Sequence, residues 1–340
     1  MPSATPTAGA SSTAPGPALG MAIDDYLRHG SASLNRIRAV LVNHQGNLVA
    51  ERYYDSDTTV HLGVQSVTWS VISTLVGIAL TKGDLTSLDQ TVGDLFPDQR
   101  SSMSKRSAAV TIRQLLTMSG GWTDHDPGMT KPKVVERILA TGPDGDPGTF
   151  AYTHIGPHLL SAALVRATGM STLEYARREL FEPLGISSKP AFEGLATDDP
   201  DELQVDKENS FQRLRDADGV HVGAFGLALT AQDMVKIGQL WLNDGVWQSR
   251  RFIDADYISA ATTNQVPELE GLSHRYGYLW FVTPLATHDA YSAFGPDGQL
   301  ITVVPDLQAV IVVSARRSET PPGIDDLLAM IDSVIVPRLT

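Results

Sequence analysis

The sequence predicts an α/β fold of the α+β type, in which an antiparallel sheet is flanked by N- and C-terminal helices and interrupted by an inserted helical region. Two β-type hairpins lie near the ends of the chain, at 37–54 and 299–314, and helical periodicity dominates 85–184 between them. Because the strands come from both ends, one sheet must join segments that are far apart in sequence. We therefore predict a disordered tail at 1–20, a sheet domain from 21–84 and 246–340, and a mainly helical domain at 85–245.

The composition is that of a globular protein without a membrane span. The 340 residues are 42% hydrophobic and 19% charged, and no apolar run approaches the roughly 18 residues of a membrane helix. The net charge of −13 disfavours nucleic acid and anionic membranes as partners, because both would repel it. The absence of cysteine excludes thiol catalysis, disulfides and thiolate metal sites. The tail lacks the basic start and apolar core of a signal peptide, so we expect a cytoplasmic protein, with a secreted form whose leader was removed as the alternative.

Local signals predict the elements in chain order. A short helix at 21–28 precedes two strands, 37–46 and 47–54, which meet at an Asn-His-Gln-Gly turn. Further helices are predicted at 110–118, 134–140, 158–168, 171–184, 230–243 and 324–335, and strands at 276–282, 299–304 and 309–314. The pairs Ser171 with Glu174 and Thr230 with Asp233 have the spacing of capping boxes. The acid-rich segment 193–208 predicts an exposed loop.

Ser66 stands at the start of a helix that is too apolar to face water. From Val67 to Leu80 the residues leave almost no polar face, which predicts a helix buried in the interior. Lys82 and Gly83 close it, because a cation suits the negative helix end and glycine takes the left-handed cap conformation. At the positive end, free backbone N–H groups stabilise a developing oxyanion. Ser66 is therefore either a helix cap or a nucleophile.

Three motifs occur in order along the chain. They are Ser66-Val-Thr-Trp69, Tyr152-Thr-His154 and Gly295-Pro-Asp-Gly-Gln299, and they are accompanied by Leu115-Leu-Thr-Met-Ser-Gly-Gly, Phe181-Glu-Pro-Leu-Gly, Gly223-Ala-Phe-Gly-Leu and Val304-Pro-Asp-Leu. Together they resemble the serine β-lactamase and penicillin-binding-protein superfamily, with its Ser-x-x-Lys, Tyr-x-Asn and Lys/His-Thr/Gly-Gly motifs. The resemblance spans residues 22–337 and is closest to the branch of class C β-lactamases, esterases and 6-aminohexanoate-dimer hydrolases. It implies the β-lactamase/transpeptidase-like fold.

The resemblance also implies an acyl-enzyme mechanism. Ser66 is then the nucleophile, Tyr152 a proton relay, and the backbone N–H groups of Ser66 and Gln299 the oxyanion hole. The chain departs from the family at the lysine, because Trp69 has no ionisable group and cannot take the serine proton. His154 replaces the family's asparagine, and histidine is the usual base near neutral pH, so it could activate Ser66 directly or through Tyr152. The alternative is that His154 only hydrogen-bonds the substrate.

Six residues are expected to line the substrate pocket, namely Gln65, Trp69, Trp122, Tyr276, Asp297 and Gly298. Trp69 either fills the space of the lysine or stacks on the substrate. An acid at Asp297, where the family has Lys, Thr or His, argues against a carboxylate substrate. The spacing in Asp124-His125-Asp126 resembles that of metal ligands, but no distant ligand accompanies it, so we predict no metal and no cofactor.

Three hypotheses about function follow. The first is a hydrolase or acyltransferase that acts on an ester or amide through an acyl-Ser66 intermediate. The second is a protein of the same fold that binds a small molecule non-covalently or catalyses a non-hydrolytic, biosynthetic reaction. The third is a hydrolase silenced by the replacement of its lysine with Trp69. For the first, we expect Ser66 to lie between the sheet and the helical region, within hydrogen-bond distance of Tyr152 or His154.

Overall fold

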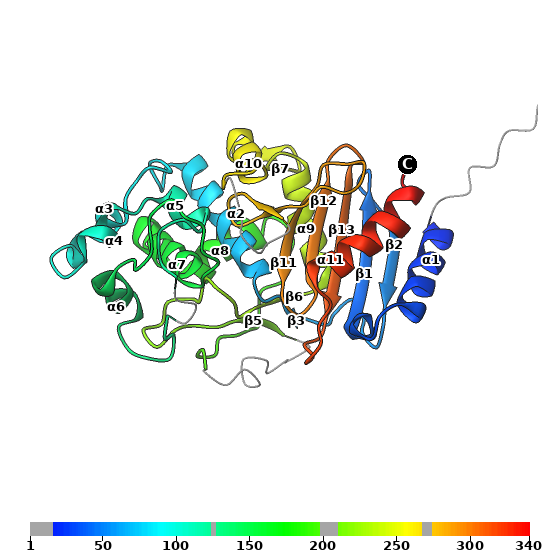
Figure 1. Ribbon diagram of the computed structural model, residues 1–340, viewed down its shortest axis with the longest axis horizontal. Helices are drawn as coiled ribbons and strands as arrows, with labels where there is room; N and C mark the ends of the chain where they lie inside the picture. The colour runs from blue at the N-terminus through cyan, green and yellow to red at the C-terminus, as the bar shows by residue number, and fades with distance from the viewer. Residues whose placement is uncertain (1–15, 124–126, 198–209, 267–273) are drawn as a thin grey trace, which may run out of the picture.

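The structure, a computed structural model, describes residues 16–123, 127–197, 210–266 and 274–340. One antiparallel sheet has the strand order β2 (Asn47–Tyr53), β1 (Ile37–His44), β13 (Ala309–Ala315), β12 (Gln299–Val304), β11 (Tyr291–Gly295), β10 (Phe281–Val282) and β9 (Arg275–Tyr276). The two ends of the chain meet where β1 pairs with β13, from Ile37 opposite Ala315 to His44 opposite Ala309. Figure 1 shows these strands in one half of the molecule and most of the helices in the other. The predicted fold class and both predicted hairpins are confirmed.

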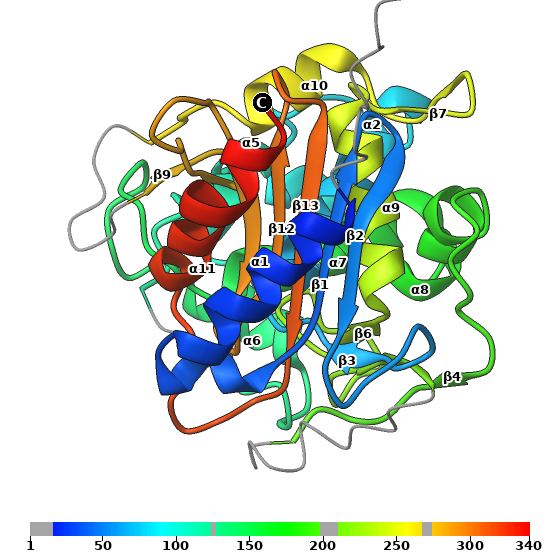
Figure 2. The same ribbon diagram turned by 90° about the vertical axis from the view of Figure 1, so that its right-hand side faces the viewer.

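Both faces of the sheet are covered by helices, because residues along its strands alternate between two cores. On β13, Val310 and Val312 belong to one core, and Ile311 and Val313 belong to the other. The second core includes apolar residues of α1 (Gly16–His29) and α11 (Ile324–Met330), which lie across one face of the sheet in Figure 2. The first core includes α2 (Val67–Lys82) and α9 (Ala231–Leu242). Residues 16–20, predicted as part of the tail, instead begin α1.

The remaining helices, apart from the 14-residue helix Ile155–Thr168, are eight residues long or shorter. They are α3 (Val92–Leu95), α4 (Lys105–Ala109), α5 (Ile112–Leu116), α6 (Val134–Thr141), α7 (Ile155–Thr168), α8 (Thr172–Ala176) and α10 (Ala255–Ala261), with 3-10 turns at Ala32–Arg36, Pro97–Gln99 and Val336–Arg338 and π-helical turns at Arg177–Phe181 and Ile331–Ile335. Of these, α3, α4 and α10 were not predicted individually. The predicted division into a sheet domain and a helical domain stays a prediction, and α9, which it assigns to the helical part, packs on β12 and β13. No helix in the described ranges is long and apolar enough to cross a membrane.

The single strand predicted at 276–282 is wrong. The chain there forms β9 and β10, which are separated by a tight turn in which the Gly277 N–H donates to the Trp280 carbonyl at 2.8 Å. Leu279 has a left-handed φ of 58°, which no regular strand contains. The alternating aromatic residues of this segment reflect packing within a turn rather than the period of a strand.

A second sheet joins the residues around Ser66 to the helical half. Its strand order is β3 (Leu62–Gly63), β6 (Leu227–Leu229), β5 (Phe211–Arg213) and β4 (Ala191–Phe192), and a separate hairpin pairs β7 (Val246–Trp247) with β8 (Arg250–Arg251). Directly after β3, the Val64 N–H donates to the Leu227 carbonyl at 2.8 Å. Since β6 follows a loop at 216–225, this pairing places the start of α2 beside the end of that loop.

Candidate active site

Ser66 immediately precedes α2, but it does not cap the helix. Its φ of −71° and ψ of −4° are helical rather than extended, and its side chain makes no capping hydrogen bond. The preceding Gln65 is held at a left-handed φ of 47°, a conformation that costs a non-glycine residue about 1–3 kcal/mol. The helix-cap alternative for Ser66 is therefore wrong, and its hydroxyl is available to other partners.

Tyr152 lies beside Ser66, close enough for the Ser66 hydroxyl to act on the Tyr152 phenol as a hydrogen-bonding partner that lowers its pKa. Burial raises the pKa of Tyr152 to about 12, and the hydrogen bond with Ser66 offsets this effect only in part. No cation contributes to lowering the pKa. Removing the proton at pH 7 would cost about 7 kcal/mol, since each pKa unit corresponds to about 1.4 kcal/mol. Tyr152 is thus a neutral phenol at rest, able to donate and accept hydrogen bonds but not ready to take the serine proton.

Trp69 lies one helical turn after Ser66 and packs against Tyr152. The two ring centroids are 4.4 Å apart, with 44° between the ring planes. The indole N–H donates to the Ala224 carbonyl oxygen at 2.5 Å, and the residue is only 1% exposed. An indole enclosed in this way has no free face on which a substrate could stack. Its hydrogen bond instead ties α2 to the 216–225 loop.

His154 joins the same cluster of rings from the position just before α7. Its ring centroid is 6.0 Å from that of Trp69 and 5.7 Å from that of Phe225, and both contacts are edge-on. His154 is partly exposed, as is Phe225. The structure therefore brings Tyr152 and His154 next to the start of α2, although they follow Ser66 by more than 80 residues in the sequence. The buried Trp69 packs against both rings.

The β11–β12 hairpin lies against the segment that precedes Ser66. A Cβ added to Gly295 would come within 2.7 Å of the Val64 carbonyl oxygen and 3.1 Å of the Gln65 Cβ, so only glycine allows this approach. Gly298 follows at a left-handed φ of 94°. The Gln299 side chain lies between Gly295 and β13: its Oε1 would be 2.6 Å from that added Cβ, and its Nε2 donates to the Ala315 carbonyl at 2.9 Å.

This arrangement places the start of β12 beside Ser66, where the oxyanion hole is predicted. Asp297 and Gln299 are both largely buried, with exposed fractions of 8% and 1%. The backbone of the hairpin therefore meets the start of α2, although the role of the Ser66 and Gln299 N–H groups stays a prediction.

Two residues predicted to line the pocket are buried, and their place in a pocket stays a prediction; Tyr276 lies close enough to Tyr152 for the charge of that phenolate to raise the Tyr276 pKa. Tyr276 is 1% exposed and packs in the core, with its ring centroid 5.2 Å from Phe150 and 5.0 Å from Phe281. Trp122 lines a hollow of about 200 Å³ together with Arg137 and Ile155. Sequence alone does not separate aromatic residues that fill a core from those that face a ligand, because both favour the same positions.

Two residues of the site were not predicted, namely Ala224 and Phe225. The motif Gly223-Ala-Phe-Gly-Leu contributed to the family resemblance, but its residue types do not indicate that the Ala224 carbonyl accepts a hydrogen bond from Trp69. The segment Asp124-His125-Asp126 lies outside the described residues, as do 198–208 of the predicted acidic loop. In the described part of the chain, no three His, Asp or Glu side chains gather as metal ligands.

Known proteins resemble this chain in sequence and in fold. The family model Beta-lactamase matches residues 23–334. A lovastatin esterase from Penicillium rubens is 26% identical over 186 residues, which are 47% of this chain and 44% of the esterase, so less than half of that relative is matched. A solved class C beta-lactamase has a TM-score of 0.74 at 18% identity, covering 97% of this chain and 98% of that one. A protein assigned as a 6-aminohexanoate-dimer hydrolase from Bacillus anthracis has a TM-score of 0.68 at 19% identity, covering 90% and 79%.

Proposed function

Because the chain belongs to the Beta-lactamase family, we propose that it is a serine hydrolase or acyltransferase that forms an acyl-enzyme on Ser66 with an ester or amide. The observation that carries the proposal is the position of Ser66 beside Tyr152 at the positive end of the buried α2. That end favours negative charge, and so stabilises the oxyanion that forms when Ser66 attacks a carbonyl carbon.

The serine proton needs an acceptor other than a lysine. Tyr152 is a poor candidate, because its pKa of about 12 keeps the phenol protonated. His154 lies in the same ring cluster and is partly exposed, and histidine is the usual general base near neutral pH. We therefore assign His154 as the base, acting directly or through the Tyr152 hydroxyl.

The proposed reaction has two steps. Ser66 Oγ attacks the acyl carbon while its proton passes to His154, and the bond to the leaving group breaks as that group takes the proton back. Water or a second acceptor then attacks the acyl-Ser66 ester by the same route and restores the free hydroxyl. Because the amine that the family places at position 69 is absent, the rate depends on how well His154 takes the role of general base, which usually contributes about 10²- to 10⁴-fold.

The test is a rapid-mixing experiment with p-nitrophenyl esters. We expect a burst of p-nitrophenol close to one equivalent per enzyme, followed by slow turnover, and a mass increase equal to the acyl group. Ser66→Ala removes both the burst and the mass increase. His154→Asn lowers the burst rate by at least an order of magnitude, because the proton acceptor is lost. A Ser66→Ala protein with an unchanged burst rules out the proposed nucleophile.

The burial of Trp69 favours a second candidate, a protein that binds a small molecule without covalent chemistry. In this case the aromatic cluster only shapes the site. The parent protein then gives no burst and no acyl adduct with any ester, and Ser66→Ala leaves ligand binding, measured by calorimetry, unchanged.

A further inference from the structure

The 216–225 loop contacts the candidate active site at two points. Its Ala224 carbonyl accepts the indole N–H of Trp69, and its Phe225 ring lies 5.7 Å from that of His154. The loop has little regular structure of its own between β5 and β6. Backbone hydrogen bonds join its ends to the chain after β5, because the Leu214 N–H donates to the Gly226 carbonyl and the Val222 N–H donates to the Leu214 carbonyl, each at 2.9 Å. Side chains from neighbouring elements add further contacts.

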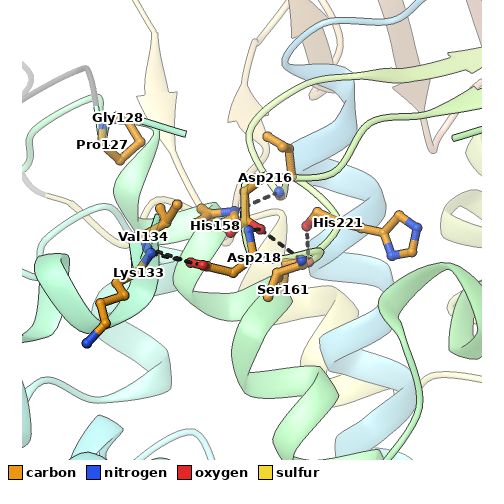
Figure 3. Close-up of polar contacts among 12 residues, drawn as sticks. Pro127, Gly128, Lys133, Val134, His158, Ser161, Asp216, Asp218 and His221 are labelled. Carbon is orange, nitrogen blue, oxygen red and sulfur yellow. Dashed lines mark hydrogen bonds and ion pairs between the residues drawn. The ribbon is translucent and has the colours of Figure 1, made fainter. Parts of the chain in front are cut away.

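One set of contacts comes from α7 (Figure 3). His158 donates from Nε2 to the Asp216 carboxylate at 3.1 Å, and both side chains are completely buried. The other Asp216 oxygen accepts the N–H groups of Asp218 and Val220, each at 2.9 Å. Ser161, one turn further along α7, donates to the His221 carbonyl at 2.6 Å. These contacts hold the first half of the loop.

The second half of the loop is held by Arg213, at the end of β5. The Arg213 Nη1 donates to the carbonyl oxygens of Val222 at 2.5 Å and Phe225 at 3.1 Å, which lie on the two sides of Ala224. The residue is 4% exposed, and no carboxylate among the described residues forms an ion pair with it. Burying a guanidinium removes its bonds to water, so the two carbonyls that replace them fix where the Arg213 group lies.

We propose that Arg213 is a positioning residue for the candidate active site. By fixing the carbonyls on both sides of Ala224, it aims the Ala224 carbonyl at the Trp69 indole and so keeps Trp69 against Tyr152. Its effect on catalysis rests on the proposed function, but its effect on the position of Trp69 does not. Arginine suits this role because its planar group holds its N–H donors in a fixed arrangement, whereas the three donors of lysine rotate at the end of a flexible stem.

The experiment follows Trp69 directly. The protein is labelled with 5-fluorotryptophan, which gives one ¹⁹F signal for each of its five tryptophans, and Trp69→Phe identifies the signal of Trp69. Arg213→Met removes the donors while keeping a long side chain, and we expect it to shift or broaden the Trp69 signal. The matched control is Arg251→Met, because Arg251 also donates from Nη1 to two carbonyls, those of Asp244 and Ile253, neither of them on this loop. The control leaves the Trp69 signal in place.

A kinetic cycle tests the same coupling if the parent protein gives a burst. Arg213→Met is expected to lower the burst rate on the order of tenfold, since small displacements at a reacting centre have effects of this size or larger. In a protein that already carries Trp69→Phe and so lacks the indole N–H, we expect Arg213→Met to change the burst rate little. If the double variant instead lowers the burst rate by the product of the two single effects, Arg213 does not act through Trp69, and this also overturns the proposal.

Two outcomes of the ¹⁹F experiment overturn the proposal. One is a folded Arg213→Met protein whose Trp69 signal is unmoved. If that variant does not fold, Arg213→Gln decides, because the shorter glutamine side chain does not reach both carbonyls, and an unmoved Trp69 signal there has the same meaning. A parent protein that gives no burst contradicts the proposed function but leaves the ¹⁹F result fully informative.

Discussion

At the scale of single residues, the side chain at position 69 can either pack against Tyr152, as Trp69 does, or place a positive charge near Ser66, as the family's lysine does. Trp69 packs on Tyr152 and bonds Ala224, and it leaves Ser66 without the ammonium group that the family places one turn away. A cation there would lower the pKa of Tyr152, because an opposite charge favours the phenolate.

If Trp69 silences an ordinary hydrolase, Trp69→Lys raises the hydrolysis of p-nitrophenyl esters by about 10²- to 10⁴-fold, the usual contribution of a general base; with His154 already acting as the base, the gain is smaller. The variant loses stability, on the order of 3–5 kcal/mol, because a large buried aromatic side chain is removed. Trp69→Met is the matched control, since it also loses the ring but gains no amine. Steady-state kinetics with a Ser66→Ala version of each variant measure the gain. No increase in a folded Trp69→Lys protein excludes the hypothesis of a silenced ordinary hydrolase.

The pH dependence of acylation identifies the base. A base must be deprotonated to act, so with His154 as base kcat/KM rises with pH and levels off above about pH 7.5, beyond the usual titration of histidine. With Tyr152 as base, whose pKa is about 12, the rate would continue to rise tenfold per pH unit through pH 10. Burst rates between pH 5 and 10 distinguish the two, and we expect the plateau to disappear in His154→Asn.

At the scale of elements, sequence reasoning succeeded where a signal was long and local. The apolar run of α2, its left-handed Gly83 and the Thr230–Asp233 capping box of α9 are all present as predicted. Short elements such as α3, β9 and β10 were missed or merged because tertiary contacts, rather than propensity, define them. The same limit applies to the site. Its motifs located Ser66 and Tyr152, but the meeting of Trp69 with Ala224, 155 positions away, follows only from packing.

The close approach of the β11–β12 hairpin to Ser66 predicts a sharp effect of one methyl group. Gly295→Ala places a Cβ 2.7 Å from the Val64 carbonyl, so the hairpin must move away from the start of α2. We expect a loss of stability of about 1–3 kcal/mol and a slower burst. Gly63→Ala, on β3, meets no atom within 4 Å and serves as the control in thermal unfolding and burst kinetics. Equal behaviour of the two variants would contradict this account of the hairpin.

The buried pair of His158 and Asp216 predicts a dependence of stability on pH. Burial alone would raise the pKa of Asp216, but the hydrogen bond and charge of His158 and two backbone amides lower it overall. Because this pKa is lower in the folded protein than in the unfolded chain, its contribution to stability is present at neutral pH and is lost as the pH falls below about 4.

Asp216→Asn should therefore destabilise the protein at pH 7 by about 1–3 kcal/mol, because an amide N–H then faces the donor on His158. Urea unfolding at pH 7 and at pH 3.5 measures the effect, and the difference from the parent protein shrinks at the lower pH. Asp94→Asn, at an exposed helix cap, is the control and changes stability by less. If the difference in unfolding free energy between the Asp216→Asn protein and the parent instead grew at pH 3.5, the pKa of Asp216 would not be lowered by folding, and the prediction would be wrong.

At the scale of the whole molecule, the fold class and the family were both predictable. The resemblance to the β-lactamase superfamily over residues 22–337 is confirmed by a family match at 23–334. The sheet is completed only when β13, from the end of the chain, pairs with β1, and α1 then covers that sheet together with α11. The first helix is thus part of the core rather than an appendage.

A chain that begins at Ser31 tests this arrangement. It lacks Leu19, Ile23 and Leu27, each 9% exposed or less, and their burial contributes about 1.5–3 kcal/mol per residue. The sum is comparable to the 5–15 kcal/mol stability of a typical domain, so we expect the shortened chain not to fold. Met21→Asp in the full chain is the control, because Met21 is 67% exposed on the same helix. A shortened protein with the cooperative thermal transition of the parent would refute this prediction.

The position of Trp69 also gives the protein an optical probe of its own chemistry. Its indole is buried, lies against Tyr152 and is one helical turn from Ser66. An acyl group on Ser66 would change the surroundings of this fluorophore, while the emission of the other four tryptophans can be subtracted with Trp69→Phe. Acylation by colourless esters and amides can then be followed in real time without labels, which opens substrate screening to compounds that release no dye.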